Sequence, residues 1–159
     1  MRNTLLISSF FALVPLLSTG CGPTYLPNTE IEDTDQNREI VAFCERYRHA
    51  VEDLNVGLIL SLTSPRYFDN SGTPTGDDDF DRRGLEEMLK ARFQAVRSMR
   101  YEIKYRNLYE RDGLFMIDYT YTMSFEYEVG GKTKWANKTA ENRLEIEKVD
   151  GGYLIVAGL

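Results

Sequence analysis

Residues 115–127 read FMIDYTYTMSFEY, and every second side chain in this stretch is apolar or aromatic. The side chains between them are polar except for Met116. Because successive side chains of a β-strand point to opposite faces of the sheet, the pattern predicts a long strand with one apolar face. That face needs a covering layer, so the stretch predicts a layered domain built on a sheet. The residues predicted to point inward are Phe115, Ile117, Tyr119, Tyr121, Met123, Phe125 and Tyr127.

The same period of two recurs on both sides of this strand. Residues 99–106 alternate in the same way, residues 132–148 place Leu144 inward, and the segment YLIVAGL ends the sequence. The short turns RDG, GG and DGG separate these segments, which indicates an antiparallel meander of about four long strands. Trp135 has the opposite parity to Leu144, so a β-bulge is predicted between them.

Helical patterns precede the meander over residues 35–54, 56–62 and 83–97. Cys44 lies on the apolar side of the first helix and is expected to be buried, whereas His49 lies opposite and is expected to be exposed. The apolar side of the third helix is marked by Leu85, Met88, Leu89, Arg92 or Phe93, and Val96. The predicted fold class is therefore α+β, with three N-terminal helices packed on a curved, mainly antiparallel and cone-like sheet.

Four segments carry a resemblance to a known family. They are IVAFCERYRHAVEDLN, LSLTSPRYFDNSG, GLEEMLKARFQAV and ENRLEIEKVDGGYLIVAGL, spread over residues 36–159. In this order they resemble the nuclear transport factor 2-like fold, which ketosteroid isomerase shares. The resemblance implies a single domain over residues 35–159 and contains no catalytic motif, so it bears on architecture more than on activity.

The beginning of the sequence, MRNTLLISSFFALVPLLSTGCGP, has an apolar block of about thirteen residues followed by small residues and Cys21. It resembles a bacterial lipoprotein signal, although Ser18 occupies the position where that pattern prefers leucine. The resemblance implies that residues 1–20 are removed, that Cys21 carries the lipid, and that residues 21–34 form a flexible tether. The expected location is the cell envelope, anchored to a membrane through lipid and facing the periplasm, with the outer membrane favoured over the inner.

The composition excludes several classes of function. The formal net charge of -6 disfavours nucleic-acid binding, which requires a basic surface. One histidine and one cysteine besides Cys21 are too few for a usual zinc site. The acidic run GDDDFDRRG, residues 76–84, fails as an EF-hand loop because Arg82 and Met88 stand where glycine and glutamate are required. We expect no metal and no cofactor, and we expect the acids of this run to cap the third helix.

Six side chains are candidates for a pocket inside the cone. Tyr47 lies on the apolar side of the first helix, Tyr67 and Asp69 lie in the loop that rims such a cone, and Asn142 shares the parity of Leu144. Tyr101 and Tyr119 lie on the apolar faces of their strands. Asp118 has the opposite parity to Tyr119, so it is expected on the polar outer face.

Three functions remain open from the sequence. The first is non-enzymatic binding or scaffolding of an envelope partner or a small apolar ligand, which the aromatic inner face favours. The second is a cone-type isomerase, dehydratase or hydrolase using Tyr47, Tyr67 and Asp69, since relatives of this fold pair a carboxylate base with a tyrosine. The third is a purely structural envelope lipoprotein. The mixed charges on the outer sheet face favour a monomer.

Overall fold

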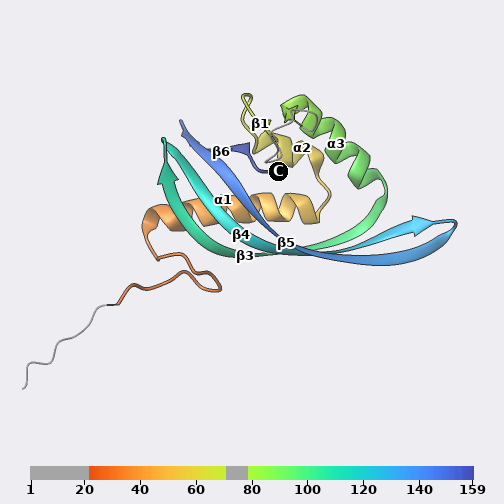
Figure 1. Cartoon of the computed structure of the whole chain (residues 1–159), viewed down its shortest axis with the longest axis horizontal. Coiled ribbons are helices and arrows are strands. Elements are labelled where there is room, and N and C mark those ends of the chain that lie inside the picture. The colour runs from red at the N-terminus through yellow and green to blue at the C-terminus, as the bar shows by residue number, and fades with distance from the viewer. Residues whose placement is uncertain (1–21, 71–78) are drawn as a thin grey trace, which may run out of the picture.

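The computed structural model describes residues 22–70 and 79–159; Cys21 and the first part of the acidic run lie outside these ranges. The elements follow one another as α1 (Asp35–Glu52), α2 (Val56–Ser61), β1 (Phe68–Asp69), β2 (Phe80–Asp81), α3 (Arg82–Gln94), β3 (Val96–Arg111), β4 (Leu114–Val129), β5 (Lys132–Val149) and β6 (Gly152–Ala157). Figure 1 shows the three helices on one side of a curved sheet, with the β4–β5 hairpin reaching beyond them. The α+β class is confirmed.

The sheet has the order β3-β4-β5-β6, and each pair of neighbours is antiparallel. Two tight turns make the first hairpins possible. Asp112 and Gly113 both have positive φ, as do Gly130 and Gly131, which is the backbone twist that matches two neighbouring antiparallel strands. The predicted meander of four strands is therefore confirmed, although β6 is shorter than the other three.

Two predicted features of the chain order are wrong. The helices do not all precede the strands, because the short pair β1–β2 comes before α3. In addition, α3 ends at Gln94, and Val96 is the first residue of β3. Val96 is therefore not part of the apolar side of the helix, as predicted, but belongs to a strand. Helical and strand patterns overlap at this junction, and the alternation of β3 continues backwards into the residues that also fit a helical stripe.

The predicted bulge between Trp135 and Leu144 is absent. The pairing of β4 with β5 runs without a shift from Phe115–Ile146 to Val129–Lys132. Trp135 lies opposite Glu126 on the outer face and is 63% exposed. The register shifts of the sheet lie instead in β3, near its start and after Tyr105, and at the start of the β5–β6 pairing. The opposite parity of Trp135 and Leu144 therefore reflects an outward Trp135 side chain in a regular strand.

Helix α1 packs on the sheet mainly against β3. Thr34 caps it by accepting a hydrogen bond from the Asn37 amide at 3.1 Å, and its apolar side is fully buried. Cys44 is among the buried residues, as predicted, and burial raises the pKa of its thiol. His49 is exposed, also as predicted. On the outer face of the sheet, Asp118 pairs with Arg143 at 2.6 Å.

The segment expected to be a tether is partly packed on the domain. Leu26 and Ile31 are buried, and the Leu26 amide donates to the Ile31 carbonyl at 2.9 Å. The Glu30 amide donates to the Tyr105 carbonyl at 3.1 Å, which fixes this turn to β3. The prediction of a flexible tether up to residue 34 is therefore wrong for this turn. Leu26 and Ile31 belong to no periodic apolar pattern, so the sequence did not indicate that they would be buried. Among the described residues, no helix is long and apolar enough to cross a membrane.

Candidate ligand pocket

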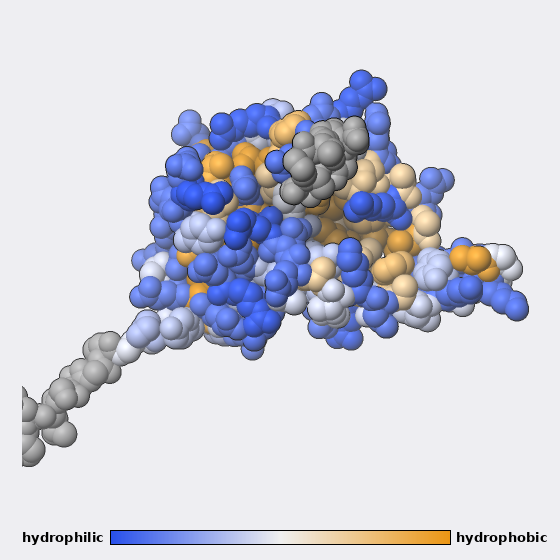
Figure 2. Space-filling view, viewed as in Figure 1, coloured by the Kyte–Doolittle hydropathy of each residue, from blue (hydrophilic) through white to orange (hydrophobic). Residues whose placement is uncertain are grey.

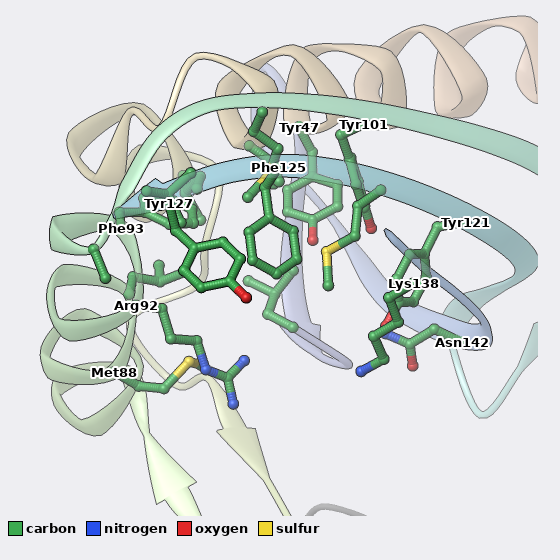
Figure 3. A pocket seen from close by; sticks show the side chains of 18 residues that line it. Tyr47, Met88, Arg92, Phe93, Tyr101, Tyr121, Phe125, Tyr127, Lys138 and Asn142 are labelled. Atoms are coloured by element: carbon green, nitrogen blue, oxygen red, sulfur yellow. The ribbon is translucent and has the colours of Figure 1, made fainter. Parts of the chain in front are cut away.

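A pocket of about 370 Å³ opens between α3 and the sheet, where the start of β3, the end of β4 and the middle of β5 lie side by side. Most of its wall is apolar, as Figure 3 shows for the labelled side chains from α1, α3 and the three long strands. The volume is at the low end of the range found for small-molecule sites. The lining residues are Tyr47, Val51, Ile59, Met88, Leu89, Arg92, Phe93, Ala95, Val96, Met99, Tyr101, Tyr121, Met123, Phe125, Tyr127, Lys138, Asn142 and Leu159.

The pocket exists because the cover over β4 ends before the strand does. Phe115, Ile117 and Tyr119 are buried beneath the helices. Beyond Tyr119 the inward side chains of the same strand, starting with Tyr121, are only partly buried. Their apolar faces therefore line a hollow, and Figure 2 shows apolar side chains within it and hydrophilic residues around it.

A group of tyrosines forms the polar end of the pocket. The rings of Tyr47 and Tyr101 pack edge to face with centroids 6.5 Å apart, and the Tyr101 hydroxyl is close enough to those of Tyr47 and Tyr119 to influence its pKa. The Asn142 side-chain amide donates to the Tyr119 hydroxyl at 3.2 Å. Burial raises the pKa of Tyr101 to about 12, and it raises the pKa values of Tyr47 and Tyr119 well above their usual range. These phenols therefore remain neutral hydrogen-bonding groups at neutral pH.

Two of the lining residues are charged, and both are cationic. Arg92 comes from α3 and Lys138 from β5, and in Figure 3 their side chains point toward the space between these elements. The Lys138 amino group also lies 5.9 Å from the centroid of the Tyr121 ring. Aspartate, glutamate and histidine side chains are missing from the described lining, so the pocket itself offers no obvious general base.

The loop residues Tyr67 and Asp69 do not line this pocket. Tyr67 is buried, and its hydroxyl donates to the Asp69 carboxylate at 3.1 Å. The same carboxylate oxygen accepts the Gly158 amide at 2.8 Å, and the Leu159 amide donates to the Tyr67 hydroxyl at 3.1 Å. These bonds hold the end of the chain against the rim loop. Asp69 faces a second hollow of about 440 Å³, which shares Arg92 and other lining residues with the first.

The six sequence candidates are thus divided between the pocket wall and its supports. Tyr47, Tyr101 and Asn142 line the pocket, and Tyr119 accepts a hydrogen bond from Asn142 without lining it. Tyr67 and Asp69 belong to the neighbouring loop. Cys21, the predicted lipid site, lies outside the described residues.

Sequence reasoning missed the cations. Arg92 was placed on the inner side of the third helix but received no role. Lys138 has the same strand parity as Asn142 and Leu144, which was the signal that it faces inward. A charged residue within an apolar alternation is easily taken for a solvent-exposed end of the strand.

The described part of the acidic run serves α3. Asp81 is the N-cap of this helix, and its carboxylate accepts the amides of Arg83 at 3.0 Å and Gly84 at 2.9 Å. Gly84 is required for close packing, since a Cβ there would lie 2.8 Å from the Cβ of Phe80. Within residues 22–70 and 79–159, no cluster of three or more metal-ligating side chains is present.

Comparison with solved structures identifies the fold. A protein of Salmonella enterica described as a member of the nuclear transport factor 2-like superfamily matches with a TM-score of 0.61 at 14% identity, covering 76% of this chain and 86% of that one. The chain has the nuclear transport factor 2-like fold. The resemblance seen in the sequence is therefore confirmed at the level of the fold, and with it the curved antiparallel sheet under three helices.

Other matches with this fold have diverse names. A Novosphingobium aromaticivorans protein named after scytalone dehydratase has a TM-score of 0.64 at 12% identity, covering 77% of this chain and 80% of that one. A Xanthomonas campestris protein named after the association domain of calcium/calmodulin-dependent protein kinase II has a TM-score of 0.62 at 20% identity, covering 86% and 90%. No protein-family model and no curated protein sequence matches the chain. Similarities this low establish the fold alone, which includes both enzymes and binding proteins.

Proposed function

We propose that the protein is a lipid-anchored envelope protein whose domain binds a small, largely apolar ligand without chemically changing it. The observation that supports this most directly is the 370 Å³ pocket, whose wall is built from the inward aromatic and methionine side chains of β3 and β4. A folded domain gains stability by covering such side chains, so leaving them around a hollow is a cost that ligand binding explains.

The described pocket wall favours binding over catalysis. Besides the cations Arg92 and Lys138, its polar groups include the Asn142 amide, which donates to the Tyr119 hydroxyl. They also include the phenols of Tyr47 and Tyr101, whose pKa values are raised by burial. The carboxylate predicted as a catalytic candidate, Asp69, accepts hydrogen bonds from the Gly158 amide and the Tyr67 hydroxyl. In this arrangement Asp69 organises the end of the chain, which differs from the base expected for an isomerase of this fold.

Filling the pocket tests the binding proposal. Met123→Trp places an indole in the pocket, and the matched variant Thr122→Trp places the same group one residue away on the exposed outer face. Fluorescence of anilinonaphthalene sulfonate, which brightens in apolar sites, reports occupancy. We expect saturable binding by the unchanged protein and by Thr122→Trp, and at least roughly tenfold weaker binding by Met123→Trp. Equal binding by all three proteins would refute the proposed pocket function.

Lipid attachment is tested separately in a bacterial host. Cells grown with labelled palmitate are expected to label the unchanged protein and the Cys44→Ser variant, because Cys44 is fully buried in the core. The Cys21→Ser variant is expected to lose the label and to leave the membrane fraction. Labelling that persists in Cys21→Ser would disprove the anchor.

A further inference from the structure

The charges of the pocket narrow the class of ligand, provided that the pocket binds a ligand as proposed. We propose that the ligand is a small amphipathic anion, with an apolar body inside the pocket and a compact oxyanion head between Arg92 and Lys138. The proposal depends on three observations: the sign of the charges, their lack of carboxylate partners, and their position.

The sign of the charges in the pocket opposes that of the whole molecule. The chain has 25 acidic and 19 basic residues, yet both charged side chains in the described pocket wall are basic. A negatively charged protein repels anions over long range, so an anion is held only where cations are placed locally. A neutral apolar ligand would need no such placement.

Neither cation is neutralised by a carboxylate within the described residues. The thirteen ion pairs found there include neither Arg92 nor Lys138. Two other cations of α3 pair with carboxylates, Arg83 with Glu87 at 3.2 Å and Lys90 with Glu86 at 2.5 Å, and Arg82 donates to the Leu60 carbonyl at 2.9 Å. Arg92 is the cation of α3 that lines the pocket.

The position of the two cations suits a single anionic head. Arg92 and Lys138 come from elements on different sides of the pocket, and Figure 3 shows both side chains directed toward the space between them. A guanidinium binds a carboxylate or phosphate through two parallel hydrogen bonds, and an ammonium adds a flexible point charge. The apolar side chains that line the pocket, including Met123 and Met99, would surround the body of the ligand.

A probe series with one tail and three heads tests this inference. Octanoate, octanol and octylamine compete with anilinonaphthalene sulfonate for the full chain, which carries Cys21→Ser in every variant so that no attached acyl chain competes. We expect octanoate to bind at least roughly tenfold more tightly than octanol, and octylamine to bind most weakly. Octyl phosphate in place of octanoate determines which oxyanion is preferred, and the tighter of the two is then used for the variants.

Charge-removing variants identify the residues responsible. Arg92→Gln and Lys138→Gln should each reduce the preference for the anion roughly tenfold and leave octanol binding within about twofold. Lys148→Gln makes the same charge change on β5 far from the pocket and should alter neither. Added salt should weaken octanoate binding more than octanol binding, because exposed charges are screened. Circular dichroism checks that each variant is folded.

The outcomes separate this inference from the function on which it rests. If octanol binds as tightly as the anions, or if the anion preference survives both glutamine substitutions, the amphipathic anion is refuted and the apolar pocket stands. If no probe displaces the reporter and Met123→Trp binds it as well as the unchanged protein, the proposed function fails as a whole.

Discussion

The two halves of strand β4 have the same sequence pattern and different surroundings. In the first half, Ile117 and Tyr119 are buried against the helices. In the second half, Met123 and Phe125 continue the same alternation but line an open pocket. The difference lies in the cover, since α1 packs along β3 in the first half and α3 is a shorter helix beside the second. An apolar face therefore becomes core or binding surface according to what another part of the chain places over it.

Truncating one inward side chain in each half of β4 should give the largest difference in stability between the two halves. Ile117→Ala removes a side chain with no exposed surface and should lower the free energy of unfolding by about 2–4 kcal/mol. Met123→Ala removes the same number of side-chain heavy atoms next to open space, and the loss should remain below about 1 kcal/mol, because the cavity already exists. Urea denaturation measures both values. Similar losses at the two positions would mean that the second half of β4 is packed like the first.

Alkaline pH should destabilise the folded protein through Tyr101, which is buried at the polar end of the pocket. The pKa of Tyr101 is raised by burial to about 12 in the folded protein, against about 10 for an unfolded chain. The unfolded chain therefore loses this proton first, so the stabilising contribution is complete below pH 10 and is lost as the pH rises toward 12. The loss is on the order of 2 kcal/mol for this residue.

Substitution of the phenol checks the origin of that loss. Tyr101→Phe has no proton to release, so its stability should decline less steeply between about pH 10 and pH 12. Denaturation curves at several pH values, compared with the phenolate absorbance of the native protein, measure the effect. A Tyr101 hydroxyl that titrates at its ordinary pKa in the folded protein would contradict its burial at the polar end of the pocket.

The rim loop should show a smaller, purely structural effect. Asp69→Ala removes the acceptor for the Gly158 amide and the Tyr67 hydroxyl, and it should lower the free energy of unfolding by about 1–2 kcal/mol. Binding of anilinonaphthalene sulfonate should stay within about twofold, because Asp69 does not line the apolar pocket. A large change in ligand binding with unchanged stability would instead assign Asp69 to the site.

Much of the fold was predictable because it depends on local chemistry. The alternation of residues 115–127 determines a strand, and the positive φ values at Asp112 and Gly113 suit the short turn before it. Asp81 was recognisable as an N-cap because a short oxygen-bearing side chain satisfies free amides at a helix start. Each of these features needs only a few neighbouring residues.

The remaining features depend on contacts between distant parts of the sequence. Nothing near Met123 tells how far α3 extends over it, and the alternation is the same whether a strand is covered or open. Tyr67 and Asp69 are predicted pocket residues, yet their hydrogen-bond partners are Gly158 and Leu159, which are far from them in the sequence. Arg92 and Lys138 come together only because a helix and a strand separated by a long hairpin flank one opening.

A crystal structure of the full chain bearing Cys21→Ser, grown with octanoate, is the most direct test of the central claim that the open half of the sheet is a binding site. The account predicts electron density for the alkyl chain between α3 and β4, with the carboxylate near Arg92 and Lys138. A pocket closed by its own side chains, with Met123 and Phe125 packed as tightly as Ile117, would contradict it.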